Sequence, residues 1–330
     1  MSNYLLELSD DALERLESLR TLLPDVRAFV RDHTPKHWPM LTDVIESAMD
    51  EPLEPPAVLP LASCSAVGGD PAAAVPVSAA WTVLGMAIRV LDDVQDQDRS
   101  DALWAQVGPA RAFNLSAGLF SLSLRLLAEG YEPEVHQRLA RVFTGEGLRL
   151  AAGQDRDLQG AAPSLEEHWQ TFEEKNARAF VLACEAGAHC GTQEPSSVRA
   201  CAQYGLHLGN VLQVFDDVQG LWAPDGVGDL AIEKATLPLY YGLSFEHDDR
   251  DRLAAWKDAG VLHENAPAVV AILDRLDARA FMMWTALQER TRAYDALVPC
   301  PGVAGTQALR AYVTVPFAEL ESLVQPIALG

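Results

Sequence analysis

The chain has 330 residues, of which 49% are hydrophobic, so it is long enough to bury a large core, as one big domain or as two ordinary ones. Its 47 acidic and 25 basic residues give a net charge of −22, which argues against bulk electrostatic binding of nucleic acid or anionic lipid. Its five cysteines are odd in number and lack metal-site spacing, which indicates reduced thiols in a cytosolic setting.

The N-terminal stretch MSNYLLELSDDALERL is acidic and amphipathic. It has neither the basic start nor the apolar block of a signal peptide, and no run in the chain approaches the roughly 18 apolar residues of a membrane span. We therefore expect a soluble, cytoplasmic protein with no membrane span and no nucleic-acid partner.

Helical patterns follow one another along the chain, and alternating strand patterns are absent. A long apolar helix is expected to begin at Asp70 and Pro71, an N-cap followed by proline, with a bend at Pro76. The predicted helices, in chain order, cover 5–23, 37–49, 70–97, 108–129, 134–158, 164–189, 196–221, 235–243 and 266–294.

The breaks between these helices are short and rich in proline and glycine, so none resembles a linker between domains. We predict a single all-α domain over 1–330. N-terminal helices and a Pro-rich acidic loop occupy 1–60, a core covers 68–243, and further helices occupy 244–330.

The string DDVQ occurs near the end of the third predicted helix, within LDDVQDQD. Asp92 and Asp96 are four residues apart and share one helix face, while Asp93 lies about 100° round the helix from Asp92. Like charges on an apolar helix repel unless a cation joins them or one carboxylate takes up a proton. Such hard oxygen ligands suit Mg²⁺, which also bridges to substrate phosphates. The alternative is a solvated acidic helix end.

The same string returns in FDDVQG, where Asp216 and Asp217 stand near the end of a second apolar helix. Two matching contexts are a stronger signal than one short motif. Facing each other across a bundle, the two carboxylate clusters would hold a diphosphate through metal ions.

With these motifs the sequence resembles the trans-type isoprenyl diphosphate synthase (polyprenyl synthetase) family, from about Gly68 to Leu243. The shared stretches are VGGDPAAA, DDVQD, GQDRDL with Gln154 and Asp157, EEKNA with Lys175, QVFDD with Gln213, and GDLAIEKATLP with Asp229, Lys234 and Thr236. The resemblance implies a helical bundle of the isoprenoid synthase type with a central apolar cavity. It also implies a homodimer.

The resemblance further implies a site for an allylic prenyl diphosphate and three Mg²⁺ ions. The metal ligands would be Asp92, Asp93, Asp96, Asp216 and Asp217. The diphosphate would bind Arg99, Lys175 and Lys234, with Gln154, Asp157, Gln213, Asp229 and Thr236 in support. The departing tail would leave as an allylic cation, which a dry apolar cavity shields from water.

Tail length in this family depends on side chains just before the first motif. These are Leu84, Ala87 and Ile88 in this chain. Because none is a large aromatic residue, a longer tail such as the C20 class is favoured over C10. Ordinary core packing is the alternative for all three.

The sequence departs from the family in three places, two of which concern the acceptor. Elongating members carry a basic G-G-K-R-x-R-P stretch, where Glu51 to Pro56 here reads EPLEPP. After the first motif this chain offers only Arg99 in place of two arginines. Gly220 replaces the last aspartate of the second motif, which leaves Asp216 as the main metal ligand on that side. An unmetallated diphosphate needs charge-assisted donors, so a second diphosphate is poorly provided for.

The function that we rank first is therefore the Mg²⁺-dependent ionisation of a C15 or C20 allylic diphosphate. The resulting cation is either cyclised, as in a terpene synthase, or transferred to an acceptor other than isopentenyl diphosphate. The first alternative is an ordinary elongating synthase of the farnesyl or geranylgeranyl type with a relocated acceptor site, using Lys36, Arg111 or Arg178. The second alternative is a non-catalytic partner subunit of a prenyl synthase.

Overall fold

The structure is a computed structural model that describes residues 9–53, 55–96, 101–160, 164–222, 228–231 and 236–317. Within these ranges every regular element is helical, which confirms the predicted all-α class. The elements are α1 (Asp10–Arg20), α2 (Leu23–His33), α3 (Pro39–Asp50), η1 (Pro55–Val58), α4 (Leu59–Ala66), η2 (Pro71–Ala74), α5 (Val75–Asp96), α6 (Leu103–Val107), α7 (Pro109–Gly130), α8 (Pro133–Leu158), α9 (Leu165–Phe172), η3 (Glu173–Ala177), α10 (Arg178–Gly191), α11 (Pro195–Trp222), α12 (Gly228–Ala231), α13 (Leu237–Leu243), α14 (Arg250–Ala259), η4 (His263–Asn265), α15 (Ala266–Arg275), α16 (Ala278–Ala296) and α17 (Val303–Thr314).

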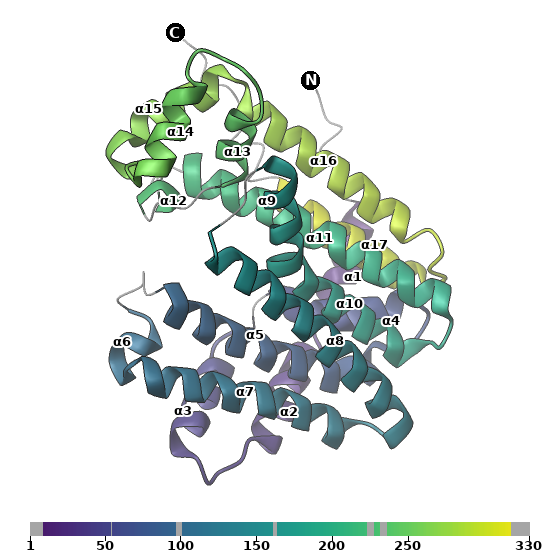
Figure 1. Cartoon of the computed structure of the whole chain (residues 1–330). Helices are drawn as coiled ribbons and strands as arrows, with labels where there is room; N and C mark the ends of the chain where they lie inside the picture. The colour runs from purple at the N-terminus through teal and green to yellow at the C-terminus, as the bar shows by residue number, and fades with distance from the viewer. Residues whose placement is uncertain are drawn as a thin grey trace.

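Helices α5 and α7 lie side by side at one end of the molecule, α10 and α11 run through its middle, and α13 to α15 gather at the other end (Figure 1). An added Cβ on Gly130, at the end of α7, would lie 2.3 Å from Pro76 Cβ at the start of α5. Further along, Ser116 Oγ donates to the Ala87 carbonyl at 2.7 Å. These two contacts make the helices antiparallel, so the last turn of α5, with its aspartates, lies beside the start of α7.

Among the described residues, one helical segment, Pro71–Asp96, has the length and composition of a membrane-crossing helix, with a mean hydropathy of 1.6. The expectation that no segment approaches a membrane span was therefore wrong on composition. In the folded chain 44% of its apolar window is buried. The apolar residues of α5 that are fully buried include Val77, Ala80 and Val83, which recur at helical spacing.

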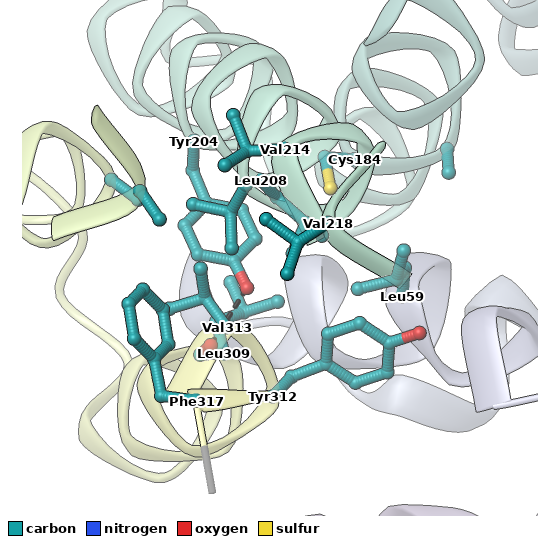
Figure 2. Packing of buried hydrophobic residues seen from close by; sticks show 14 of the residues in the cluster. Leu59, Cys184, Tyr204, Leu208, Val214, Val218, Leu309, Tyr312, Val313 and Phe317 are labelled. Atoms are coloured by element: carbon teal, nitrogen blue, oxygen red, sulfur yellow. Dashed lines mark hydrogen bonds between the residues drawn. The ribbon is translucent and has the colours of Figure 1, made fainter. Parts of the chain in front are cut away.

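Helix α11 packs one face against α17 and leaves another for the centre of the bundle. Figure 2 shows Tyr204, Leu208 and Val218 of α11 facing Leu309 and Val313 of α17. Tyr204 is fully buried, and its hydroxyl donates to the Leu309 carbonyl at 2.7 Å. This packing fixes the rotation of α11 and therefore the direction in which its second DDVQ motif points.

Two predicted helices are interrupted in the structure. The helix predicted over 164–189 is divided into α9 and α10 by the π-helical turn η3. The helix predicted over 266–294 is divided into α15 and α16 near Asp277, whose φ of 57° is left-handed. The predicted ranges do not cover six of the described helices, namely α2, α4, α6, α12, α14 and α17. Helix α4 is buried almost throughout, so it has no polar face from which a helical period could be recognised.

Candidate active site

An apolar cavity of about 440 Å³ lies at the centre of the bundle. Helices α5, α7, α8, η3, α10 and α11 all contribute to its walls. The lining residues are Leu84, Ile88, Leu91, Asp92, Phe120, Gly147, Leu150, Ala151, Gln154, Lys175, Asn176, Ala179, Phe180, Gly209, Leu212 and Gln213. Its polar lining side chains are Asp92, Gln154, Lys175, Asn176 and Gln213, among which are residues from both aspartate-bearing helices.

The first motif ends α5 at this cavity. Asp92 lines the cavity and is partly buried, as is Asp93, whereas Asp96 is exposed. Burial raises the pKa of Asp92 from 3.8 to about 6. The Lys175 ammonium lowers this pKa, whereas the carboxylates of Asp96, Asp93 and Asp157 raise it further. The carboxylates of Asp93, Asp96 and Asp157 are thus close enough to Asp92 to disfavour its charged form, and a bound cation would offset that repulsion.

The two aspartates of the second motif have different environments. Asp217 is 2% exposed, and its Oδ2 accepts a hydrogen bond from the backbone N–H of Leu237 at 2.8 Å. Its Oδ1 accepts from Gln213 Nε2 at 3.0 Å. Asp216 is exposed and accepts a longer bond, of 3.3 Å, from the same nitrogen. Asp216 is thus the accessible carboxylate, whereas Asp217 fixes the start of α13.

The π-helical turn η3 presents Lys175 to the cavity. Lys175 Nζ donates to Asp157 Oδ2 at 2.5 Å. Two glycines allow the turn to approach its neighbours closely: an added Cβ on Gly153 would lie 2.4 Å from Lys175 N, and one on Gly209 would lie 2.5 Å from Ala177 Cα. Lys175 therefore lies beside Asp92 because the backbone of η3 is packed between α8 and α11.

Of the remaining predicted site residues, the structure describes some in full, one by its backbone alone and two not at all. Gln154 lines the cavity, and its Nε2 donates to Gln95 Oε1 at 2.8 Å. Thr236 is 1% exposed, and its buried Oγ1 has no partner among the described residues. Asp229 belongs to the short helix α12, of which only the backbone is described at this position. Arg99 and Lys234 lie outside the described residues.

The tail residues divide into two groups. Leu84 and Ile88 line the cavity, but Ala87 does not: it is 3% exposed and packs in the interface with α7. Phe120 on α7 also lines the cavity and was missed by the sequence analysis. The antiparallel register of α5 and α7 sets Phe120 about level with Leu84, two helical turns from Asp92, or about 12 Å along the helix. No motif marks Phe120, so only the α5 and α7 pairing could have identified it.

The basic residues considered for a relocated acceptor site have other partners. Lys36 Nζ lies 3.2 Å from Glu46 Oε1, Arg111 Nη2 lies 3.4 Å from Met40 Sδ, and Arg178 Nη1 lies 3.8 Å from Glu146 Oε2. None of the three lines the cavity. Among the residues described, Lys175 is the one cationic side chain that does.

The carboxylates fit a divalent cation through their chemistry. No compact group of three or more ligand residues forms within the described ranges. Asp92 on α5 lines the cavity, and the exposed Asp216 on α11 accepts a hydrogen bond from Gln213, which lines the cavity too. This arrangement suits Mg²⁺, which keeps several waters and shares substrate phosphate oxygens in place of a complete protein cage.

The cavity, the two aspartate motifs and η3 all lie within a region that matches known proteins. A geranylgeranyl diphosphate synthase of Mycobacterium tuberculosis is 30% identical over 212 residues, which span 60% of this chain and only 61% of that protein. The fold is similar to that of a geranylgeranyl pyrophosphate synthetase from Pyrococcus horikoshii (TM-score 0.81, 22% identity, 92% of this chain and 98% of that one). It is also similar to that of a polyprenyl synthase from Caulobacter crescentus solved with calcium and isoprenyl diphosphate (TM-score 0.79, 19% identity, 92% and 96%). The model of the Polyprenyl synthetase family matches residues 57–268, and the chain belongs to that family.

Proposed function

We propose that this protein is a metal-dependent prenyltransferase that ionises an allylic prenyl diphosphate and joins the prenyl group to isopentenyl diphosphate. The observation that supports the proposal best is the apolar cavity of about 440 Å³, which has Asp92 and Lys175 in its wall. A prenyl tail fits the apolar walls, and its diphosphate fits the polar end. The geranylgeranyl diphosphate synthases among the similar proteins favour elongation, which the sequence analysis had placed second.

The residues at the polar end of the cavity would have separate roles in ionisation. Asp92, Asp93, Asp96 and Asp216 would hold Mg²⁺, and Asp217 would anchor the second motif through Leu237. Mg²⁺, when bound, neutralises the charge that develops on the diphosphate leaving group. Lys175, and Lys234 by analogy with the family, would add charge-assisted hydrogen bonds to the same group. The apolar walls keep water from the cation that remains.

A second candidate is transfer of the cation to another acceptor, or its cyclisation. Two observations favour it: the acidic segment EPLEPP stands where elongating members are basic, and Lys175 is the single cationic side chain that lines the described cavity. A second diphosphate next to the first, without further cations, is electrostatically unfavourable. This candidate retains all the roles assigned to the aspartates and differs only in what captures the cation.

One product assay separates the candidates. Purified protein with Mg²⁺ is given farnesyl or geranylgeranyl diphosphate, with and without isopentenyl diphosphate. A product five carbons longer, formed only when isopentenyl diphosphate is present, is the expected result for elongation. Hydrocarbon or alcohol formed from the allylic diphosphate alone would establish the second candidate. If neither forms, and turnover appears only after mixing with another prenyl synthase, the chain is a partner subunit.

A further inference from the structure

Two of the five cysteines lie next to each other in the fold although they are 99 residues apart in the sequence. Cys201 is on α11, Cys300 is in the segment between α16 and α17, and their Sγ atoms are 4.0 Å apart. Both are free thiols. The sulfurs of a disulfide are about 2.0 Å apart, so a movement of about 2 Å would join this pair.

Helix α4 contacts both sides of the pair. Cys201 is fully buried, and its Sγ lies 4.0 Å from the carbonyl oxygen of Ser63. On the other side, the backbone N–H of Gly302 donates to the Ala66 carbonyl at 2.8 Å, and an added Cβ on Gly302 would collide with the Ser65 carbonyl oxygen. The packing of the fold therefore keeps the two thiols in contact.

Burial and hydrogen bonding distinguish one of the five thiols from the others. Burial raises the pKa of Cys64 and Cys184 to about 12 and that of Cys190 to about 11. The pKa of Cys300 is lowered, because the Cys201 thiol donates a hydrogen bond to its sulfur. Cys300 is also partly exposed, whereas Cys201 is fully buried. Since the thiolate is the reactive form of cysteine, Cys300 is the thiol that a small oxidant attacks first.

We propose that Cys300 and Cys201 form a site of reversible oxidation, in which a peroxide converts the two thiols into a disulfide. The Cys300 thiolate attacks one peroxide oxygen and the O–O bond breaks. The hydroxide that leaves takes up a proton, and Cys300 becomes a sulfenic acid. The Cys201 sulfur then attacks the Cys300 sulfur, the S–O bond breaks, and a second water leaves with the proton of the Cys201 thiol. Two thiols lose two electrons in all, and one peroxide is reduced to two waters.

The disulfide would change the stability of the fold and leave the aspartate motifs as they are. Cys201 lies about 22 Å along α11 from Asp216, so the link forms far from the second motif. It would close a long loop of the chain, which restricts the unfolded state and raises stability. We expect the oxidised protein to melt about 5 °C above the reduced protein.

Mass spectrometry of the full chain tests the pairing. The reduced protein is treated with hydrogen peroxide, its remaining thiols are alkylated under denaturing conditions, and disulfide-linked peptides are identified. We expect the loss of two hydrogens, alkylation of three of the five cysteines, and one linked pair of peptides, containing Cys201 and Cys300. Dithiothreitol should restore all five thiols and the lower melting temperature.

Three variants separate the roles of the cysteines. Cys300→Ser removes the attacking thiol, so the other four cysteines should stay reduced under the same treatment. In Cys201→Ala the second step is lost, and oxidation should stop at a sulfenic acid on Cys300, which dimedone traps. Cys190→Ser is the control, because Cys190 is also partly exposed but lies 3.3 Å from the Tyr131 hydroxyl. It should form the disulfide as the wild-type protein does.

Three results would overturn the proposal. The first is alkylation of all five cysteines in the peroxide-treated wild-type protein, and the second is a linked pair that contains Cys64, Cys184 or Cys190. The third is a melting temperature that falls on oxidation, because it would show that the link distorts the fold. None of these measurements depends on turnover, so the proposed function can fail without affecting the result.

Discussion

The two adjacent aspartates of the second motif have different structural roles. Asp216 and Asp217 are adjacent in the sequence, yet one is exposed and the other is 2% exposed. The difference arises because consecutive residues on a helix lie about 100° apart, so only one of them can face the packed side of α11. The buried one is compensated by the Leu237 N–H and by Gln213. The sequence analysis assigned both to metal binding, with Asp216 as the main ligand, but it did not predict the burial of Asp217.

Asp92 is expected to destabilise the metal-free protein. Its pKa in the folded state is about 6, above the value of 3.8 for an unperturbed carboxyl. The folded state therefore favours the protonated carboxyl, and the stabilisation is at its full value below pH 4 and is lost as the pH rises through 6. In EDTA at pH 7.5, Asp92→Asn should therefore raise the free energy of unfolding, by on the order of 2 kcal/mol. The same variant should lose turnover. Thermal denaturation from pH 4 to 8 measures the effect, and an equal gain at every pH would contradict it.

At the scale of elements, η3 determines where Lys175 and Asn176 lie. A π-helical turn shifts the residues that follow it round the helix axis, and such turns are frequent at functional sites. Here it is stabilised on both sides by glycine contacts, from Gly153 on α8 and Gly209 on α11. The helical period over 164–189 predicted an uninterrupted helix, because a π-helical turn leaves no mark in composition. Its cause lies in neighbouring helices distant in the sequence.

Gly153→Ala should therefore disturb the site through η3. The added methyl group would lie 2.4 Å from Lys175 N, so the backbone of the turn has to move. We expect a loss of stability of about 1–3 kcal/mol from overpacking and a larger fall in kcat than Gly145→Ala produces. Gly145 is on the same helix with nothing within 4 Å of an added Cβ, so its alanine variant should gain up to about 1 kcal/mol of stability from helix propensity. Equal kinetics in the two variants would contradict this role of η3.

At the scale of the whole molecule, the helices could be predicted from local sequence signals, whereas the residues that line the cavity depend on contacts between helices. Apolar spacing placed α5 and its aspartates correctly, because it acts within a few turns of one helix. Asp70 and Pro71 begin the preceding 3₁₀ turn η2, so α5 itself starts at Val75 and not at Asp70 as predicted. The exclusion of Ala87 from the cavity and the inclusion of Phe120 depend on the register between α5 and α7. That register is set by side-chain packing between helices, which a single sequence does not display.

Self-association is the remaining expectation at this scale, and we place it on the outer surfaces of α7 and α8. Phe113 on α7 is 58% exposed, and Leu148 on α8 is 73% exposed. Large apolar side chains concentrated on a surface mark interaction sites. We expect the wild-type protein to sediment as a homodimer and Leu148→Asp to sediment as a monomer, because dimerisation would bury the new charge without a partner. Val298→Asp, at an equally exposed position between α16 and α17, is the control and should stay dimeric. A Leu148→Asp protein with the wild-type mass would place the interface elsewhere.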